Sequence, residues 1–206
     1  MNTEKEFKTQ LEKELYALNF DKQMLFGLSC IERTKDLYAN IYEKEIINNP
    51  TEYDKQFLGN GVNLDKIYSN VLQHFISNKK LSKGEFEQYI QQCFDFAPNL
   101  EEDNELVHHI AIHTCLLFSD ILNYYISEDQ EVIMNYYSNL MELINMIGSE
   151  NFYSQYPDAS DKACDNYLSE LFMAEIKKEL YVIELLRQNV DWIIISEFNQ
   201  KNKIMS

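Results

Sequence analysis

Very few residues in this sequence can interrupt a helix. The 206 residues include only 5 glycines and 3 prolines, which are the residues that most often end helices or form turns. Apolar residues recur at intervals of three and four in segment after segment, and the alternation typical of strands is hard to find. The sequence therefore predicts an all-α fold.

The apolar pattern divides into about seven predicted helices. They cover, in order, residues 3–19, 21–47, 64–75, 82–97, 103–126, 127–148 and 163–198. The stretches 48–63 and 149–162 hold the turn-forming residues and are predicted as long loops. No linker or repeat divides the chain, so residues 1–206 are expected to form a single-domain helical bundle.

Two of these helices should lie at the centre of the bundle. Apolar residues cover most of the circumference of the second and fifth helices, so residues such as Leu28, Ile31, Ile112 and Leu117 should be buried. The seventh and last helix would be about 50 Å long. A compact domain of this size is about 43 Å across, so this long C-terminal helix must span the fold, overhang it or break.

Helix-capping signals mark several predicted ends. Three capping boxes pair Thr3 with Glu6, Ser82 with Glu85 and Ser127 with Gln130, while Asp21 and Asn63 are single N-caps and Gly148 is a C-cap.

The chain is strongly acidic. It carries 34 acidic and 18 basic residues, for a formal net charge of −16. Nucleic-acid binding and attraction to an anionic membrane both need clustered basic residues, so neither partner is expected. The acidity is explained either by solubility or by a basic protein partner.

Four widely spaced cysteines lie mostly in apolar helical segments: Cys30, Cys93, Cys115 and Cys164. They form no CxxC pair, which favours free thiols in a reducing compartment. The N-terminus lacks a basic-then-apolar signal and no apolar run approaches the ~18 residues of a membrane helix. We therefore expect a cytoplasmic protein.

The fifth predicted helix contains one cluster of possible metal ligands. Glu105, His108, His109 and His113 follow each other at spacings that place ligands on one helical face. A di-iron bundle needs a second ExxH and two further glutamates, but the remaining histidine, His74, lacks that glutamate. We therefore predict no bound metal or other cofactor, and histidines that are structural or incidental.

Arg33 lies on an apolar stripe of a helix that should be central. A guanidinium there needs a carboxylate partner, so Arg33 should be more than half buried in an ion pair. Anion binding is the functional alternative. Glu32 and Tyr38, on the same helix, complete a possible structural or functional cluster.

Three segments resemble a known family. The segment FGLSCIERTKDLYANIY places Glu32, Arg33 and Tyr38 at matching positions, and GNG at residues 59–61, followed by KIYSNVL, is similar to a family turn and helix start, with a two-residue insertion after the turn. These segments resemble the YjaG-like family of uncharacterised bacterial proteins, the domain of unknown function 416.

The third segment runs from Pro98 to Leu122. Ala111, Ile112 and Cys115 match the alanine- and cysteine-containing helix of that family. His109 and Ile110 replace its usual Tyr-Pro, and His113 replaces its usual Asp. The resemblance implies a single all-helical domain of bacterial origin, with no established activity or site residues.

Two functions remain open on the sequence alone. The first is a non-enzymatic protein-interaction domain that binds a basic protein or its own copy. The aromatic-rich segment NFYSQYPDAS and the seventh helix are the expected homodimer contact. The second is a metal-dependent helical enzyme that uses the Glu/His cluster of the fifth helix.

Overall fold

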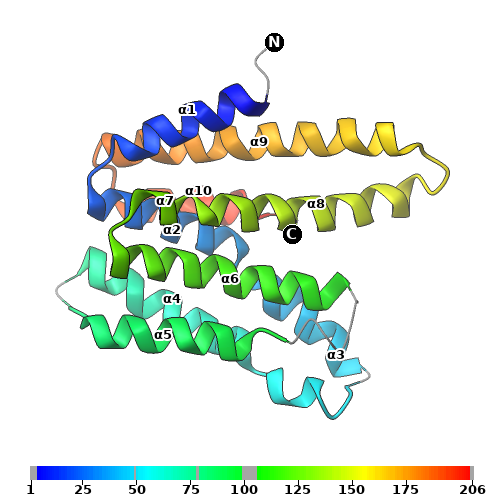
Figure 1. Cartoon of the computed structure of the whole chain (residues 1–206), viewed down its shortest axis with the longest axis horizontal. Coiled ribbons are helices and arrows are strands. Elements are labelled where there is room, and N and C mark those ends of the chain that lie inside the picture. The colour runs from blue at the N-terminus through cyan, green and yellow to red at the C-terminus, as the bar shows by residue number, and fades with distance from the viewer. Residues whose placement is uncertain (1–3, 49, 78, 99–105, 205–206) are drawn as a thin grey trace.

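The computed structural model describes residues 4–48, 50–77, 79–98 and 106–204, and in these ranges all regular secondary structure is helical (Figure 1). The elements are α1 (Glu4–Tyr16), α2 (Phe20–Thr34), the π-helical η1 (Tyr38–Glu43), α3 (Lys44–Asn48), the 3₁₀ turn η2 (Asp54–Phe57), α4 (Asn60–Ile76), α5 (Lys83–Phe96), α6 (Leu106–Ser127), α7 (Gln130–Ile133), α8 (Asn135–Gln155), α9 (Asp161–Arg187) and α10 (Trp192–Lys201). The predicted all-α fold is confirmed.

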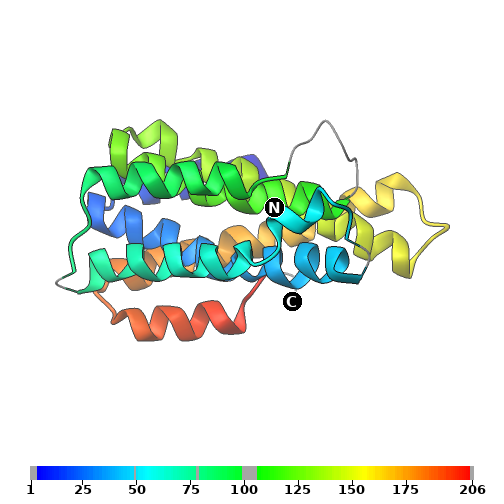
Figure 2. The ribbon, with the colours of Figure 1, turned by 90° about the horizontal axis from the view of Figure 1, so that it is seen from below.

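The helices pack side by side with their axes along the long dimension of the molecule (Figure 1). Helix α6 packs against α5 and α8, and α9 packs against α8 and α1. The joined ends of α8 and α9 project beyond the other helices (Figure 1). Helix α10 lies on the outside of the bundle, beside α4 and α9 (Figure 2).

The second and fifth predicted helices are central, as expected. Leu28, Ile31, Ile112 and Leu117 are all buried. The main apolar cluster extends from Leu11 to Ile204 and draws on residues from most of the helices.

Helix α6 is more apolar than expected from the sequence, in which no apolar run approached the length of a membrane helix. This helix is long and apolar enough to cross a membrane, yet 61% of its most apolar window is buried inside the bundle. A central helix of a bundle passes the same test of length and composition, because it too is apolar around its circumference.

The predicted helix at residues 21–47 is helical almost throughout but irregular. It begins at Phe20, because Asn19 rather than Asp21 caps it, accepting a hydrogen bond from the Lys22 amide at 3.0 Å. The hydroxyl of Thr34 donates to carbonyl groups one turn earlier, and the π-helical η1 follows. Such insertions into the helical ladder bend a helix.

The next helix, α4, starts three residues before the predicted cap at Asn63. Gly59 adopts a left-handed conformation (φ 89°) at its N-cap, which glycine does at little cost. The Glu43 carboxylate accepts a hydrogen bond from the Gly61 amide at 2.9 Å. A side chain from η1 therefore satisfies this helix start, which local sequence signals could not reveal.

The remaining cap predictions had mixed outcomes. The Ser82–Glu85 capping box is confirmed, while Thr3 lies outside the described residues. Asp129, not Ser127, caps the helix that follows α6. Gly148 is not a C-cap, since α8 continues to Gln155 and shortens the predicted loop.

The long C-terminal helix predicted over residues 163–198 is two helices. Helix α9 has 27 residues, or about 40 Å, and ends before Asn189, which takes a positive φ of 56°. Asparagine tolerates this conformation better than most residues. Asp191 then caps α10 by accepting from the Ile193 amide at 2.8 Å. The predicted helix therefore both projects beyond the fold, where α9 joins α8, and is interrupted between α9 and α10.

A close approach of α2 to α6 provides a test of the packing. A Cβ atom added at Gly27 would lie 2.5 Å from Cδ1 of Ile121, whereas one added at Gly84 would meet nothing within 4 Å. We predict that Gly27→Val lowers the free energy of unfolding by about 1–3 kcal/mol through overpacking. Gly84→Val, the matched control, should change it by less than about 0.5 kcal/mol. Urea denaturation measures both; equal effects would contradict the packing.

Candidate functional site

Neighbouring residues of α2 point to different sides of the helix. Arg33 faces α9 inside the bundle, and Glu32 faces α10 on its outside. Successive side chains of a helix are about 100° apart, so one turn of α2 builds two distinct polar sites.

Arg33 forms the inner site. It is 2% exposed and forms an ion pair with Glu175, while the Glu179 carboxylate lies 3.9 Å away. The guanidinium also donates to the Cys30 sulfur at 3.5 Å. The expectation of a buried, carboxylate-paired arginine is confirmed. These carboxylates come from α9, 142 positions along the chain in the case of Glu175.

Glu179 is the second carboxyl group of this inner site. Burial and the nearby Glu175 charge raise its pKa, Arg33 lowers it, and the net result is a pKa of about 8. The Tyr136 hydroxyl lies 3.3 Å from its Oε2 atom. With this pKa, Glu179 is mainly protonated at neutral pH, and Glu175 contacts two cations, Arg33 and the Lys178 ammonium group at 3.3 Å. The side chains of the inner site are buried, so its role is to join α2, α8 and α9.

Glu32 forms the outer site. The residue is 4% exposed, and its carboxylate accepts hydrogen bonds from the side chains of Ser196 at 2.5 Å, Asn199 at 2.8 Å and Gln200 at 3.4 Å. All three donors are neutral and belong to α10. Within the described ranges, no ion pair involves Glu32.

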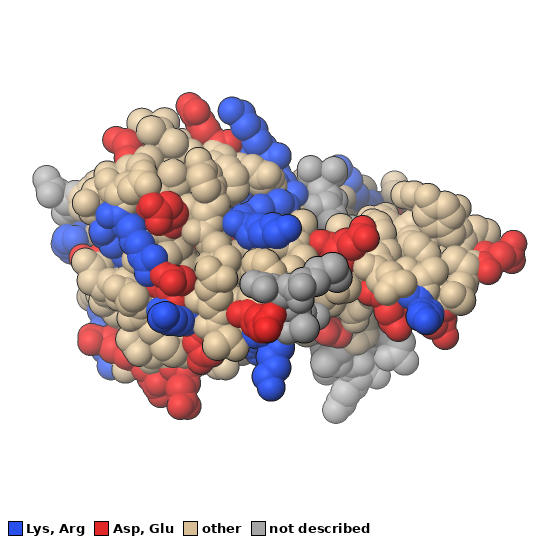
Figure 3. All heavy atoms as spheres, turned by 90° about the horizontal axis from the view of Figure 1, so that it is seen from above, with Lys and Arg blue, Asp and Glu red and all other residues tan. Residues whose placement is uncertain are grey.

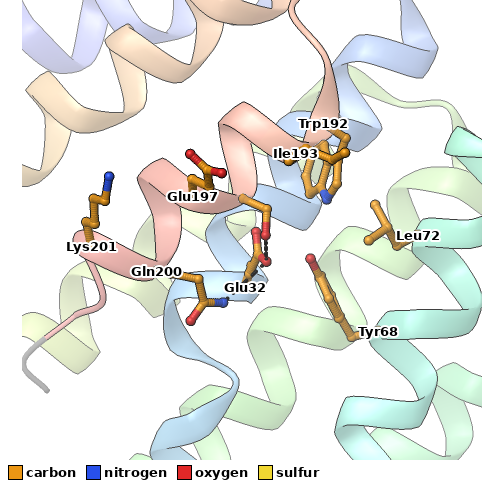
Figure 4. A pocket seen from close by; sticks show the side chains of 9 residues that line it. Glu32, Tyr68, Leu72, Trp192, Ile193, Glu197, Gln200 and Lys201 are labelled. Atoms are coloured by element: carbon orange, nitrogen blue, oxygen red, sulfur yellow. Dashed lines mark hydrogen bonds between the residues drawn. The ribbon is translucent and has the colours of Figure 1, made fainter.

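An open groove lies directly over Glu32. We call it the α4–α10 groove; it has a volume of about 480 Å³ and is lined by Glu32, Tyr68, Leu72, Trp192, Ile193, Ser196, Glu197, Gln200 and Lys201. Trp192 and Leu72 stand at one end and Lys201 at the other, with the Glu32 carboxylate between them (Figure 4). Ile193, which lines the groove, is 66% exposed, and the next residue of α10, Ile194, is 52% exposed. Exposed apolar residues around a concave site are typical of binding surfaces.

Tyr38 does not join Glu32 and Arg33. Its hydroxyl donates to the carbonyl oxygen of Phe96 at 2.8 Å, which links η1 to the end of α5. The three residues that match the family segment therefore take part in three separate interactions.

The described histidines of α6 point to different partners. His108 Nε2 lies 3.2 Å from Asp54 in η2, and His113 Nδ1 lies 2.9 Å from Asn139 in α8. His109 is partly exposed, and Glu105 lies outside the described residues. In the ranges that the structure describes, no three His, Cys, Asp or Glu side chains are grouped as a metal would require. The absence of a metal stays a prediction.

The surface charge is not gathered into one patch on the face formed by α1 and α9. Acidic and basic side chains are interspersed there (Figure 3). The net charge of −16 therefore keeps solubility as its simplest explanation for this face.

Sequence reasoning missed the two glutamates that accompany Arg33. Glu175 and Glu179 are four residues apart, which places them on one face of α9, and the buried Ile176 and Ile183 lie beside them. Two carboxylates at this spacing on an apolar seam were the available signal. Trp192 was missed because the helix was expected to continue through it.

Comparisons with known proteins bear on the fold alone. No family model and no curated protein matches the sequence. A crystal structure of a DUF416 family protein from Shewanella baltica is similar, with 17% sequence identity and a TM-score of 0.64 over 94% of this chain and 92% of that one. The likeness spans nearly the whole of both chains, so the two proteins share their helical fold.

The protonated state of Glu179 provides a test of the inner site. Because its pKa is about 8 when folded and 4.5 as a free carboxyl group, folding binds a proton, and the native state loses stability as pH rises between these values. Glu179→Gln removes this loss. We predict that the variant gains on the wild type from pH 5 to pH 8, by at most on the order of 1 kcal/mol per pH unit.

Urea denaturation at several pH values measures this gain. Glu170→Gln, an exposed position of the same helix, is the matched control and should follow the wild type. Parallel pH profiles for Glu179→Gln and the wild type would show that Glu179 is ionised in the folded protein.

Proposed function

We propose that this protein is a non-enzymatic interaction domain that binds a basic segment of a partner protein in the α4–α10 groove. One observation carries the proposal: an open, largely apolar groove lies over a buried carboxylate and is lined by an exposed isoleucine, Ile193. Central apolar anchors surrounded by polar groups are the usual source of binding energy in protein interfaces.

Charge complementarity supports a basic partner. The chain has a net charge of −16, and among the described residues that line the groove are two acids, Glu32 and Glu197, and one cation, Lys201. Opposite charges on two partners speed their encounter and disfavour acidic competitors. A basic segment with apolar residues matches both the charge and the apolar surface.

Membership of the DUF416 family, a bacterial origin and a cytoplasmic location belong to the same proposal. The shared fold with the Shewanella protein and the matching segments around Glu32 and Cys115 support the family. The four cysteines are free and buried, as in proteins of reducing compartments.

Two other functions have less support. The metal-dependent enzyme would need convergent ligands, but His108 and His113 contact separate partners. Self-association through residues 151–160 would use the exposed Tyr156, yet Phe152 of the same segment is buried against α9. A groove over a carboxylate favours a different, basic protein.

A matched pair of substitutions tests the proposal. Ile193→Asp places a charge on the apolar edge of the groove, and Ile47→Asp places the same charge on α3 at a similar exposure, 61%. In affinity capture from the native cell with quantitative mass spectrometry, we predict one predominant basic protein. Ile193→Asp should reduce its capture at least about tenfold, as for a central contact residue.

The Ile47→Asp protein should capture the partner as the wild type does. Circular dichroism and urea denaturation confirm that both variants fold. Equal capture by wild type and Ile193→Asp would exclude the groove as the binding surface. Recovery of only the chain itself would replace the partner by a homodimer.

A further inference from the structure

We infer that the α4–α10 groove takes up a lysine side chain, whose ammonium group binds the Glu32 carboxylate. This inference rests on the proposed function, because it names the group that the basic partner inserts. The inference is about Glu32 at the floor of the groove, whereas the Ile193 substitution tests the edge of the groove.

Among the described residues, the Glu32 carboxylate forms no ion pair, although the Lys35 ammonium group lies 5.2 Å from the centre of the neighbouring Tyr68 ring. Its three hydrogen-bond donors, Ser196, Asn199 and Gln200, are neutral. Lys201 points away from it at the end of the groove (Figure 4), and Lys35 pairs with Asp65 and Asp36 instead. Because a buried charge is weakly screened, a cation that enters the groove gains a strong interaction there.

The hydrogen bonds that Glu32 already accepts favour an ammonium group over a guanidinium group. Both oxygens are engaged, Oε1 by Ser196 and Gln200 and Oε2 by Asn199. A guanidinium group binds a carboxylate best through two parallel hydrogen bonds, which need a free edge. An ammonium group needs a single remaining acceptor position, such as the one on Oε2.

The walls of the groove suit the remainder of a lysine side chain. Tyr68, Leu72 and Trp192 line it, and lysine commonly places its four-carbon chain on such apolar surface. The Tyr68 hydroxyl points toward Glu32 (Figure 4) and interacts with Glu32 and Trp192, but its geometry falls short of a regular hydrogen bond. Its oxygen is a second acceptor for the ammonium group, and the Trp192 ring attracts a cation.

A metal ion does not fit the same position. Calcium takes six to eight oxygen ligands and magnesium six, whereas only two carboxylates of the described residues line this groove, and that of Glu197 points away from Glu32 (Figure 4). The occupant is therefore an organic cation with an apolar chain.

Trp192 makes the site directly observable, because it is the only tryptophan of the chain and it lines the groove. Titration with n-hexylamine, which is an ammonium ion at neutral pH, should change its fluorescence in a saturable way. Uncharged n-hexanol, of the same chain length, should bind at least about tenfold more weakly, as expected when a charged hydrogen bond is lost.

Matched carboxylate variants locate the contact. Glu32→Gln should weaken n-hexylamine binding at least about tenfold. Glu197→Gln makes the same chemical change on a carboxylate that points away from the floor (Figure 4), and it should leave binding within about twofold. Where Glu32→Gln does not fold, Tyr68→Phe replaces it and should weaken binding about three- to tenfold.

Three results would overturn the inference: no saturable signal, equal binding of n-hexanol, or equal losses for the Glu32 and Glu197 variants. The partner experiment fails separately. If n-hexylamine binds but the capture of a partner does not depend on Ile193, the ammonium site is supported and the proposal of a protein partner is refuted. If capture depends on Ile193 but is unchanged by Glu32→Gln, the protein partner is supported and the binding of its lysine to Glu32 is refuted.

Discussion

The buried ion pair between Arg33 and Glu175 is the interaction on which the rest of the structure depends. Arg33 is buried, and removing one partner of such a buried pair costs about 3–5 kcal/mol because the other charge loses its partner. The pair joins α2 to α9, and the Arg33 carbonyl oxygen also accepts a hydrogen bond from the Ile204 amide at 3.2 Å. Arg33 thereby connects α2 both to α9 and to the C-terminal segment at Ile204.

The groove follows from the same turn of α2. With Arg33 held on α9, Glu32 is directed about 100° away around α2, where its carboxylate accepts hydrogen bonds from Ser196 and Asn199 of α10. Ser29 adds a hydrogen bond to Asn199 at 2.9 Å. These contacts join α10 to α2, and the groove lies between α10 and α4. The same turn of α2 therefore provides a residue of the ion pair inside the bundle and a residue of the groove on its surface.

The spacing of the apolar residues was enough to predict the helices and the central position of α2 and α6, because a helix that is buried on many sides has apolar residues on many sides of every turn. It also predicted that Arg33 needs a carboxylate. The identity of that carboxylate, Glu175, depends on how α9 crosses α2, which no local pattern encodes. Likewise, the start of α4 depends on Glu43 from another element, and the groove depends on the break at Asn189 that turns α10 back along the bundle.

A double-mutant cycle on Arg33 and Glu175 tests the central claim most directly. Arg33→Met and Glu175→Gln are compared singly and together by urea denaturation at neutral pH. The account predicts that each single variant loses about 3–5 kcal/mol of unfolding free energy, and that the double variant loses less than the sum, by about 1–3 kcal/mol. Losses that simply add would contradict the claim that the two side chains stabilise the fold through each other.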